Sequence, residues 1–203
     1  MNRFRPNIKK NFLMIGFIIS ILIILNFFLE NYVVNKEQSS SQINIGGNFS
    51  LIDSDNNVFN SINIAKNKLI YFGYTYCPDV CPIDLNILSI LYSENKELIN
   101  YIQPIFISID PQRDNPKVIK NFLSNFDSSI IGLTGSSEEI SNVQKKFRIY
   151  KNVVQDPSEE DFYTIDHTSI FYLVDKNDLY IKHFSRKDFD KEFTSYLLNE
   201  GLI

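Results

Sequence analysis

Cysteine and histidine are both scarce in this chain of 203 amino acids, which has two of each. Two cysteines are too few for a small domain held together by disulfides, and a domain of this size does not need them. Basic residues are also in the minority, with 20 Lys and Arg against 24 Asp and Glu and a formal net charge of −4. This balance excludes a strongly basic nucleic-acid binder as the default interpretation, so we expect no nucleic-acid partner.

Low complexity and disorder are excluded as well, because the chain is 44% hydrophobic, 14% aromatic and 22% charged, as ordinary globular proteins are. No internal repeat is visible in the sequence. The length allows one domain of about 150 residues together with an additional segment.

The additional segment lies at the N-terminus, where residues 12–29 contain no charged side chain. This is about the minimum length for a helix that spans a bilayer. Only Lys36 is basic shortly after this stretch, whereas four basic residues precede it: Arg3, Arg5, Lys9 and Lys10. The positive-inside rule then places residues 1–11 in the cytoplasm as a basic tail. We predict a transmembrane anchor at 12–29, a polar tether at 30–47 and an exported domain at 48–203.

Two other interpretations of residues 12–29 stay open. A cleaved signal peptide usually has a shorter apolar core followed by small residues, and a buried core helix does not require basic residues on one flank only. The anchor predicts a single-pass inner-membrane protein with its N-terminus in the cytoplasm and its soluble domain in the periplasm. The mitochondrial intermembrane space is the less favoured compartment, because no Arg- and Ser-rich presequence precedes Phe12.

Apolar runs typical of strands alternate with amphipathic segments typical of helices along the exported domain. The predicted strands are residues 49–53, 58–59, 68–74, 101–109, 130–133, 168–174 and 179–184. The predicted helices are residues 82–95, 115–123, 136–147 and 185–201. This order predicts an α/β, thioredoxin-like fold, in which helices flank a mixed central sheet. Residues 149–165 show little periodicity and are predicted to form a long polar loop that leads into His167.

The two cysteines, Cys77 and Cys81, lie in the segment Tyr-Cys-Pro-Asp-Val-Cys-Pro between a predicted buried strand and a predicted helix. In an α/β sheet this is the edge at which ligands bind. If the segment forms one helical turn, the Cβ atoms are about 5–6 Å apart, so the thiols can share a metal ion or close into a disulfide. A purely structural disulfide is disfavoured because so short a loop removes little chain entropy.

His167 is predicted to follow the long loop and to begin the strand 168–174, whereas His183 lies inside the last strand and is interpreted as an ordinary residue. In a thioredoxin-like fold, the loop before that strand packs over the cysteine turn, and thiol-redox members have a cis-proline there. No proline follows Pro157 in this chain, so we expect the imidazole in that place. Two thiolates and one imidazole suit Cu(I) or Cu(II), whereas structural zinc usually takes four protein ligands.

Nearby acidic residues leave further alternatives. Asp79 lies between the cysteines and is expected to raise the thiol pKa values, which disfavours a highly reactive thiolate. Asp166 either orients His167 through a hydrogen bond or is an ordinary loop residue. Three charged residues after the strand 101–109 form either a partner-docking network or, as we favour, an ion pair that fixes the loop: Asp110, Arg113 and Asp114.

Residues 73–82, Gly-Tyr-Thr-Tyr-Cys-Pro-Asp-Val-Cys-Pro, resemble the signature of the Sco/SenC family of cytochrome c oxidase assembly proteins. Three further segments resemble the family in order: residues 108–114, 132–136 and 166–169. The resemblance implies a thioredoxin-like fold and one copper ion per chain, Cu(I) or Cu(II), bound by Cys77, Cys81 and His167. It also implies a partner, cytochrome c oxidase subunit II, to whose dinuclear copper site the protein delivers copper or whose cysteines it reduces.

The chain departs from the family pattern at Tyr76, where the family often has histidine, although that position is not a usual ligand. Two enzymatic interpretations compete with a copper-binding assembly protein. One is a thiol–disulfide oxidoreductase in which Cys77 attacks and Cys81 resolves; the cysteine spacing and the absent cis-proline argue against it. The other is a thiol peroxidase of the same fold that acts through Cys77, which the second thiol one turn away disfavours.

Overall fold

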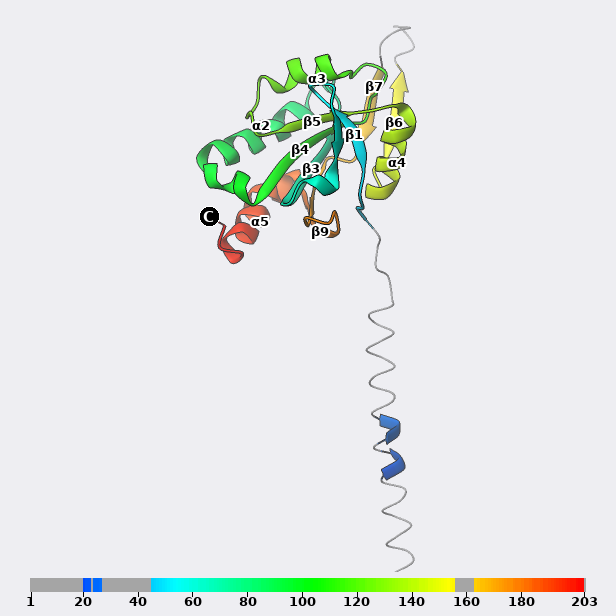
Figure 1. Ribbon diagram of the computed structural model, residues 1–203, viewed down its shortest axis with the longest axis vertical. Coiled ribbons are helices and arrows are strands. Elements are labelled where there is room, and N and C mark those ends of the chain that lie inside the picture. Colours follow the sequence, from blue (N-terminus) through cyan, green and yellow to red (C-terminus); the bar gives the residue numbers. More distant parts are fainter. Residues whose placement is uncertain (1–19, 23, 27–44, 156–162, 203) are drawn as a thin grey trace, which may run out of the picture. The chain divides into compact units, whose positions relative to one another are not determined.

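The structure is a computed structural model that describes residues 20–22, 24–26, 45–155 and 163–202 (Figure 1). The chain divides into two units, Met1–Ile43 and Asn44–Ile203. The predicted basic tail, most of the predicted anchor and most of the predicted tether lie outside the described residues. Residues 20–22 and 24–26 are helical, and none of the helices within the described ranges is both long and apolar enough to cross a membrane.

A seven-stranded mixed sheet forms the centre of the second unit, with the strand order β2-β1-β5-β4-β3-β8-β9. Strands β3, β4 and β5 run parallel, and the remaining neighbours are antiparallel. The bounds of the strands are β1 Ser50–Asp53, β2 Val58–Asn60, β3 Asn67–Gly73, β4 Ile102–Ser108, β5 Ile131–Thr134, β8 Ile170–Val174 and β9 Tyr180–Ser185. The central strand β4 is buried along its whole length, as expected of a parallel strand covered on both faces.

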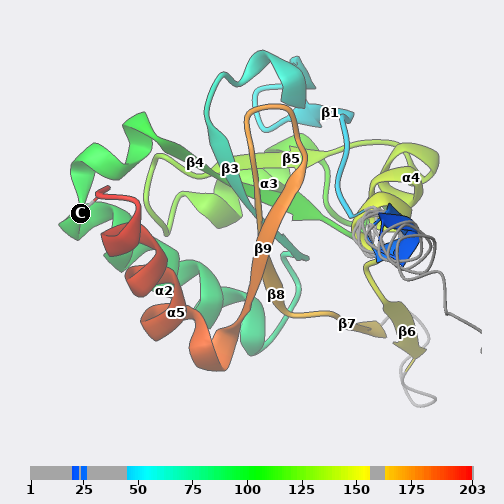
Figure 2. The ribbon, with the colours of Figure 1, turned by 90° about the horizontal axis from the view of Figure 1, so that it is seen from below.

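Helices cover both faces of this sheet (Figure 2), and their bounds are α2 Val80–Glu94, α3 Pro116–Leu123, α4 Ser137–Phe147 and α5 Arg186–Asn199. Short 3-10 helices span Ser61–Asn63 and Lys96–Asn100. Neighbouring residues of β3 point to opposite faces. Tyr71 contacts Phe171, which stacks on α5 through Phe189, whereas Phe72 packs against Phe147 of α4. The resulting α/β arrangement confirms the predicted thioredoxin-like fold.

Local signals in the sequence set the helix starts. Ser136 caps α4 by accepting a hydrogen bond from the backbone N–H of Glu139 at 3.2 Å, and the Glu139 carboxylate accepts one in return from the Ser136 N–H at 2.7 Å. Asn115 caps α3 by accepting from the N–H of Val118 at 3.0 Å, with Pro116 at the first helical position. These caps confirm the predicted starts of both helices.

The prediction of a loop over residues 149–165 is wrong in part. Strand β6, Lys151–Gln155, and strand β7, Tyr163–His167, pair in antiparallel fashion, with Lys151 opposite His167 and Gln155 opposite Tyr163. Residues 156–162 lie outside the described residues. Most of β6 is exposed, so its sequence lacks the alternation that a buried face imposes. His167 therefore ends β7, and the following sheet strand β8 begins only at Ile170.

Candidate metal centre

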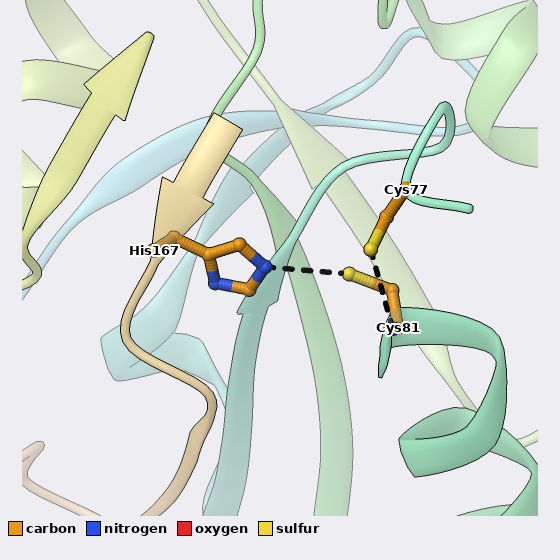
Figure 3. A group of neighbouring side chains, drawn as sticks. All are labelled: Cys77, Cys81 and His167. Atoms are coloured by element: carbon orange, nitrogen blue, oxygen red, sulfur yellow. Dashed lines mark hydrogen bonds between the residues drawn. The ribbon is translucent and has the colours of Figure 1, made fainter. Parts of the chain in front are cut away.

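Cys77, Cys81 and His167 converge at the carboxyl end of β3 (Figure 3), where one potential ligand atom of each lies within 4.8 Å of the others. Cys77 belongs to the loop after β3, Cys81 to the first turn of α2, and His167 to the end of β7. Both cysteines are free thiols and are buried, and His167 is half-buried. Three segments that are distant in the sequence thus meet at the sheet edge at which ligands of α/β proteins bind.

The loop that carries Cys77 is fixed from the end of the neighbouring strand by Asp114. This fully buried carboxylate accepts hydrogen bonds from the Thr75 N–H at 2.9 Å and the Thr75 hydroxyl at 2.6 Å. It also accepts one from the Ser108 hydroxyl at 2.6 Å. Asp110 and Arg113 form an ion pair at 2.6 Å, as the loop-fixing interpretation predicted. These charged groups shape the loop that presents the first cysteine.

The orientation of His167 is set by its own backbone neighbourhood. Its Nδ1 atom lies 3.0 Å from the carbonyl oxygen of Thr168, which can only accept a hydrogen bond, so Nδ1 carries the proton. The Nε2 atom faces the Sγ atom of Cys81 at 3.5 Å. Asp166 is exposed, and the orienting role considered for its side chain belongs to the Thr168 carbonyl. The imidazole thus presents Nε2, rather than Nδ1, to the sulfurs.

The two thiols have opposite pKa shifts. A hydrogen bond from the Cys81 side chain lowers the pKa of Cys77 to about 3, and bonds from His167 and from two backbone amides act in the same direction, against the effect of burial. The same thiol–thiol bond, together with burial, raises the pKa of Cys81. The expectation that Asp79 raises the thiol pKa is wrong for Cys77, because Asp79 acts through its backbone hydrogen bond rather than its carboxylate. The pair therefore retains one proton, on Cys81.

This donor set suits a soft or borderline metal ion. Two sulfurs and one imidazole nitrogen are available, and within the described ranges the group contains no fourth Cys, His, Asp or Glu. Structural zinc sites usually have four protein ligands, whereas thiolates and imidazole suit copper at a lower coordination number. His183, the other histidine, lies in β9 and hydrogen-bonds the hydroxyl of Tyr180 at 2.5 Å, so it takes no part in this group.

A buried polar network beneath Cys81 was not predicted from the sequence. Asp84, one turn after Cys81 on α2, is fully buried and accepts hydrogen bonds from the hydroxyls of Tyr71 and Ser169, both at 2.8 Å. Burial raises the pKa of Asp84. The sequence signal was the carboxylate on the apolar face of α2, next to Leu85.

Comparisons with known proteins agree with this geometry. The sequence profile of SCO1/SenC matches residues 37–199. An SCO2-like protein of Rickettsia conorii is 38% identical over 204 residues, which cover 95% of this chain and 99% of that protein. The structure of Bradyrhizobium japonicum ScoI with copper bound is similar at a TM-score of 0.69 and 36% identity, covering 76% of this chain and 98% of that one. Yeast Sco1 with copper bound is similar at a TM-score of 0.68 and 34% identity, covering 77% and 88%. The chain therefore belongs to the SCO1/SenC family.

Proposed function

We propose that this protein binds one copper ion through Cys77, Cys81 and His167 and acts in the assembly of cytochrome c oxidase. In this role it delivers copper to the dinuclear copper site of subunit II or reduces the cysteines of that site. The observation that carries the proposal is the convergence of two sulfurs and one imidazole nitrogen within 4.8 Å. The copper-bound structures of two similar proteins support copper as the metal.

The protonation state of the site favours metal uptake. Cys77 is ready to bind as a thiolate, because its pKa is lowered to about 3. Cys81 must release its proton when it becomes a ligand, so uptake of one ion releases one proton from the cysteine pair. His167 offers Nε2 as its ligand atom, because the Thr168 carbonyl engages Nδ1. A three-ligand site also leaves room for a ligand from a partner, which allows the ion to be passed on without being released to solvent.

The experiment is a copper titration of the full chain, in competition with a chelator, with Cu(I) and Cu(II) in separate series. The wild type should bind about one ion per chain. Loss of a residue that only supports a metal ligand typically weakens metal binding about 10- to 100-fold. His167 is itself a proposed ligand, so His167→Ala should weaken copper binding by more than about 100-fold. The matched control is His183→Ala, which removes the other histidine and should leave the affinity unchanged. Weak binding by the wild type, or equal affinities for both variants, would overturn the proposal.

A second candidate function is favoured by one observation, the lowered pKa of Cys77. A thiolate beside a protonated Cys81 could attack a disulfide, with Cys81 resolving the mixed disulfide and both cysteines ending oxidised. As a pure oxidoreductase, the protein should reduce a model disulfide as fast after His167→Ala as before. Such activity combined with weak copper binding would favour this candidate over copper delivery.

We also propose the membrane arrangement that the sequence predicts, with residues 1–11 cytoplasmic, 12–29 spanning the inner membrane, 30–47 as a tether and 48–203 in the periplasm. The basic residues that precede the apolar stretch support this orientation. Protease added to spheroplasts should digest the domain, and an alkaline wash should leave the full chain in the membrane fraction. Recovery of an intact chain from the cytosol would contradict the arrangement.

A further inference from the structure

The position of His167 depends on a hairpin that is separate from the main sheet. Strands β6 and β7 form a two-stranded sheet of their own, with no backbone ladder to the seven-stranded sheet among the residues that the structure describes. An isolated two-stranded hairpin is only marginally stable in water. The side-chain contacts between this hairpin and the rest of the domain therefore decide where the imidazole lies relative to the sulfurs.

Arg113, in the loop after β4, makes a dense set of these contacts at the start of β7. Its Nη1 atom donates to the carbonyl oxygen of Tyr163 at 2.9 Å, and its guanidinium carbon lies 3.5 Å from the centre of the Tyr163 ring. Its Nε atom donates to Asp110 at 2.6 Å, and the Tyr163 hydroxyl donates to the other oxygen of the same carboxylate at 2.8 Å. Only 17% of the Arg113 side chain and 2% of the Asp110 side chain are exposed.

The same guanidinium faces the cysteine loop. Its carbon lies 4.9 Å from the ring centre of Tyr76, the residue before Cys77, and 5.7 Å from that of Tyr74. Tyr74 in turn contacts β7, because its hydroxyl oxygen accepts a hydrogen bond from the Ile165 N–H at 3.1 Å. The Tyr74 ring also meets the His167 ring edge to face at 5.9 Å. Arg113 thus lies between the two segments that supply the sulfurs and the nitrogen.

We propose that Arg113 is a positioning residue that holds β7 against the cysteine loop and thereby sets the approach of His167 to the two sulfurs. The inference rests on the proposed copper binding at this site. Arg113 acts through the imidazole and does not itself ligate the metal. Lysine cannot replace it, because only the planar guanidinium can stack between aromatic rings while it donates to both a carboxylate and a carbonyl.

The test compares Arg113→Lys with Arg148→Lys, a matched change in an exposed arginine at the end of α4. Arg113→Lys should weaken copper binding by the full chain about 10- to 100-fold, as loss of supporting groups around metal sites does, and Arg148→Lys should have no effect. In a His167→Ala background, Arg113→Lys should cause no further loss, because residues that act through one another are not additive. Equal losses in both backgrounds would overturn the proposal.

A second measurement uses the metal-free chain, so that it does not depend on copper. Hydrogen exchange at the Ile165 amide, which is bonded to Tyr74, should be faster in Arg113→Lys, with exchange in β3 and β4 unchanged. Unchanged exchange at Ile165 would overturn the positioning role while leaving the proposed copper function intact. If exchange at Ile165 is faster in Arg113→Lys but the wild-type chain binds no copper, the positioning role is supported and the proposed copper function is rejected. If Arg113→Lys fails to fold, Tyr163→Phe decides, because it removes only the hydroxyl bond to Asp110 and should shift exchange in the same direction.

Discussion

Gly73, the last residue of β3, lies directly against Cys81: a Cβ atom at Gly73 would be 2.8 Å from the Cys81 sulfur. Such an atom would also lie 3.0 Å from the rings of Phe106 and Tyr71. The absence of a side chain at position 73 therefore gives the second cysteine its place at the sheet edge.

Gly73→Ala should consequently destabilise the domain and weaken copper binding together. Overpacking of a core typically costs about 1–3 kcal/mol, and relief of the clash requires the Cys81 sulfur to move. Urea unfolding and copper competition on the same preparation measure both effects. The control is Gly135→Ala, whose nearest neighbours are the side chains of Glu139 and Leu51 rather than either cysteine. Wild-type copper affinity in Gly73→Ala would show that the sulfur position does not depend on this contact.

The buried ion pair between Lys68 and Asp178 gives a prediction about stability alone. The two groups are 2.8 Å apart, both side chains are fully buried, and the Ser61 hydroxyl donates to Asp178 at 2.6 Å. Asp178→Asn keeps the side-chain shape, and asparagine tolerates the positive φ of 63° at this position. It leaves the buried Lys68 ammonium without a negatively charged partner, although the Lys176 carbonyl still accepts from it at 3.0 Å, so we expect a loss of about 3–5 kcal/mol in the free energy of unfolding.

Urea unfolding measures this loss, and the exposed pair Lys120–Asp55 supplies the control. Its side chains are 63% and 61% exposed, so solvent screens the pair and Asp55→Asn should cost far less than Asp178→Asn. Copper affinity should be unchanged in both variants, because neither pair includes a residue of the metal group. A loss of similar size in the two variants would contradict the structural argument.

Asp84 gives a prediction about pH. Burial raises the pKa of Asp84 in the folded state, whereas an ordinary aspartate in the unfolded chain has a pKa near 4. At a pH between these two values the carboxyl is protonated in the folded state and ionised in the unfolded chain. The stability that this carboxyl contributes is therefore complete below about pH 4 and is lost as the pH rises through the folded pKa. An asparagine side chain in its place does not ionise and would show no such loss. The free energy of unfolding of Asp84→Asn relative to wild type should accordingly increase from pH 4 to pH 8 in urea-unfolding series, and a constant difference would contradict the assignment.

The sequence predicted the main sheet and its helices because buried strands and capped helices leave strong local patterns. The apolar run of β3 and the capping box at Ser136 are examples. It also singled out Cys77, Cys81 and His167, since the chain has so few residues of these types. The membrane anchor stays a prediction, because residues 12–19, 23 and 27–29 lie outside the described residues.

The hairpin β6–β7 could not be predicted, for a physical reason. Four of the five residues of β6 are exposed, so no alternation of apolar and polar residues marks the strand. The contacts of Arg113 with Tyr163 and Tyr74 were equally invisible, because they join residues far apart in the sequence through ring faces and a backbone carbonyl. The sign of the Cys77 pKa shift was missed because it depends on a thiol–thiol hydrogen bond that spacing alone does not reveal.

The pKa of Cys77 leads to a prediction about alkylation of the reduced, metal-free chain. With the pKa lowered to about 3, Cys77 is a thiolate throughout the range from pH 5 to pH 8, so its rate of alkylation by iodoacetamide should stay nearly constant. An ordinary thiol, with a pKa near 8.5, slows about tenfold for each unit by which the pH falls in this range. Cys81 is fully buried and should react slowly, which allows Cys77 to be followed by mass spectrometry.

Two substitutions at Cys81 test the cause of this shift. Cys81→Ala removes the hydrogen bond that does most to lower the pKa of Cys77, so alkylation should become strongly pH-dependent. Cys81→Ser keeps a hydroxyl that can donate to the thiolate and should preserve most of the flat profile. A steep profile in the wild type would contradict the thiolate assignment. A flat profile in Cys81→Ala would instead show that His167 and the backbone amides are sufficient to keep the pKa of Cys77 low. The proton released on metal uptake would then not be expected to come from Cys81 alone.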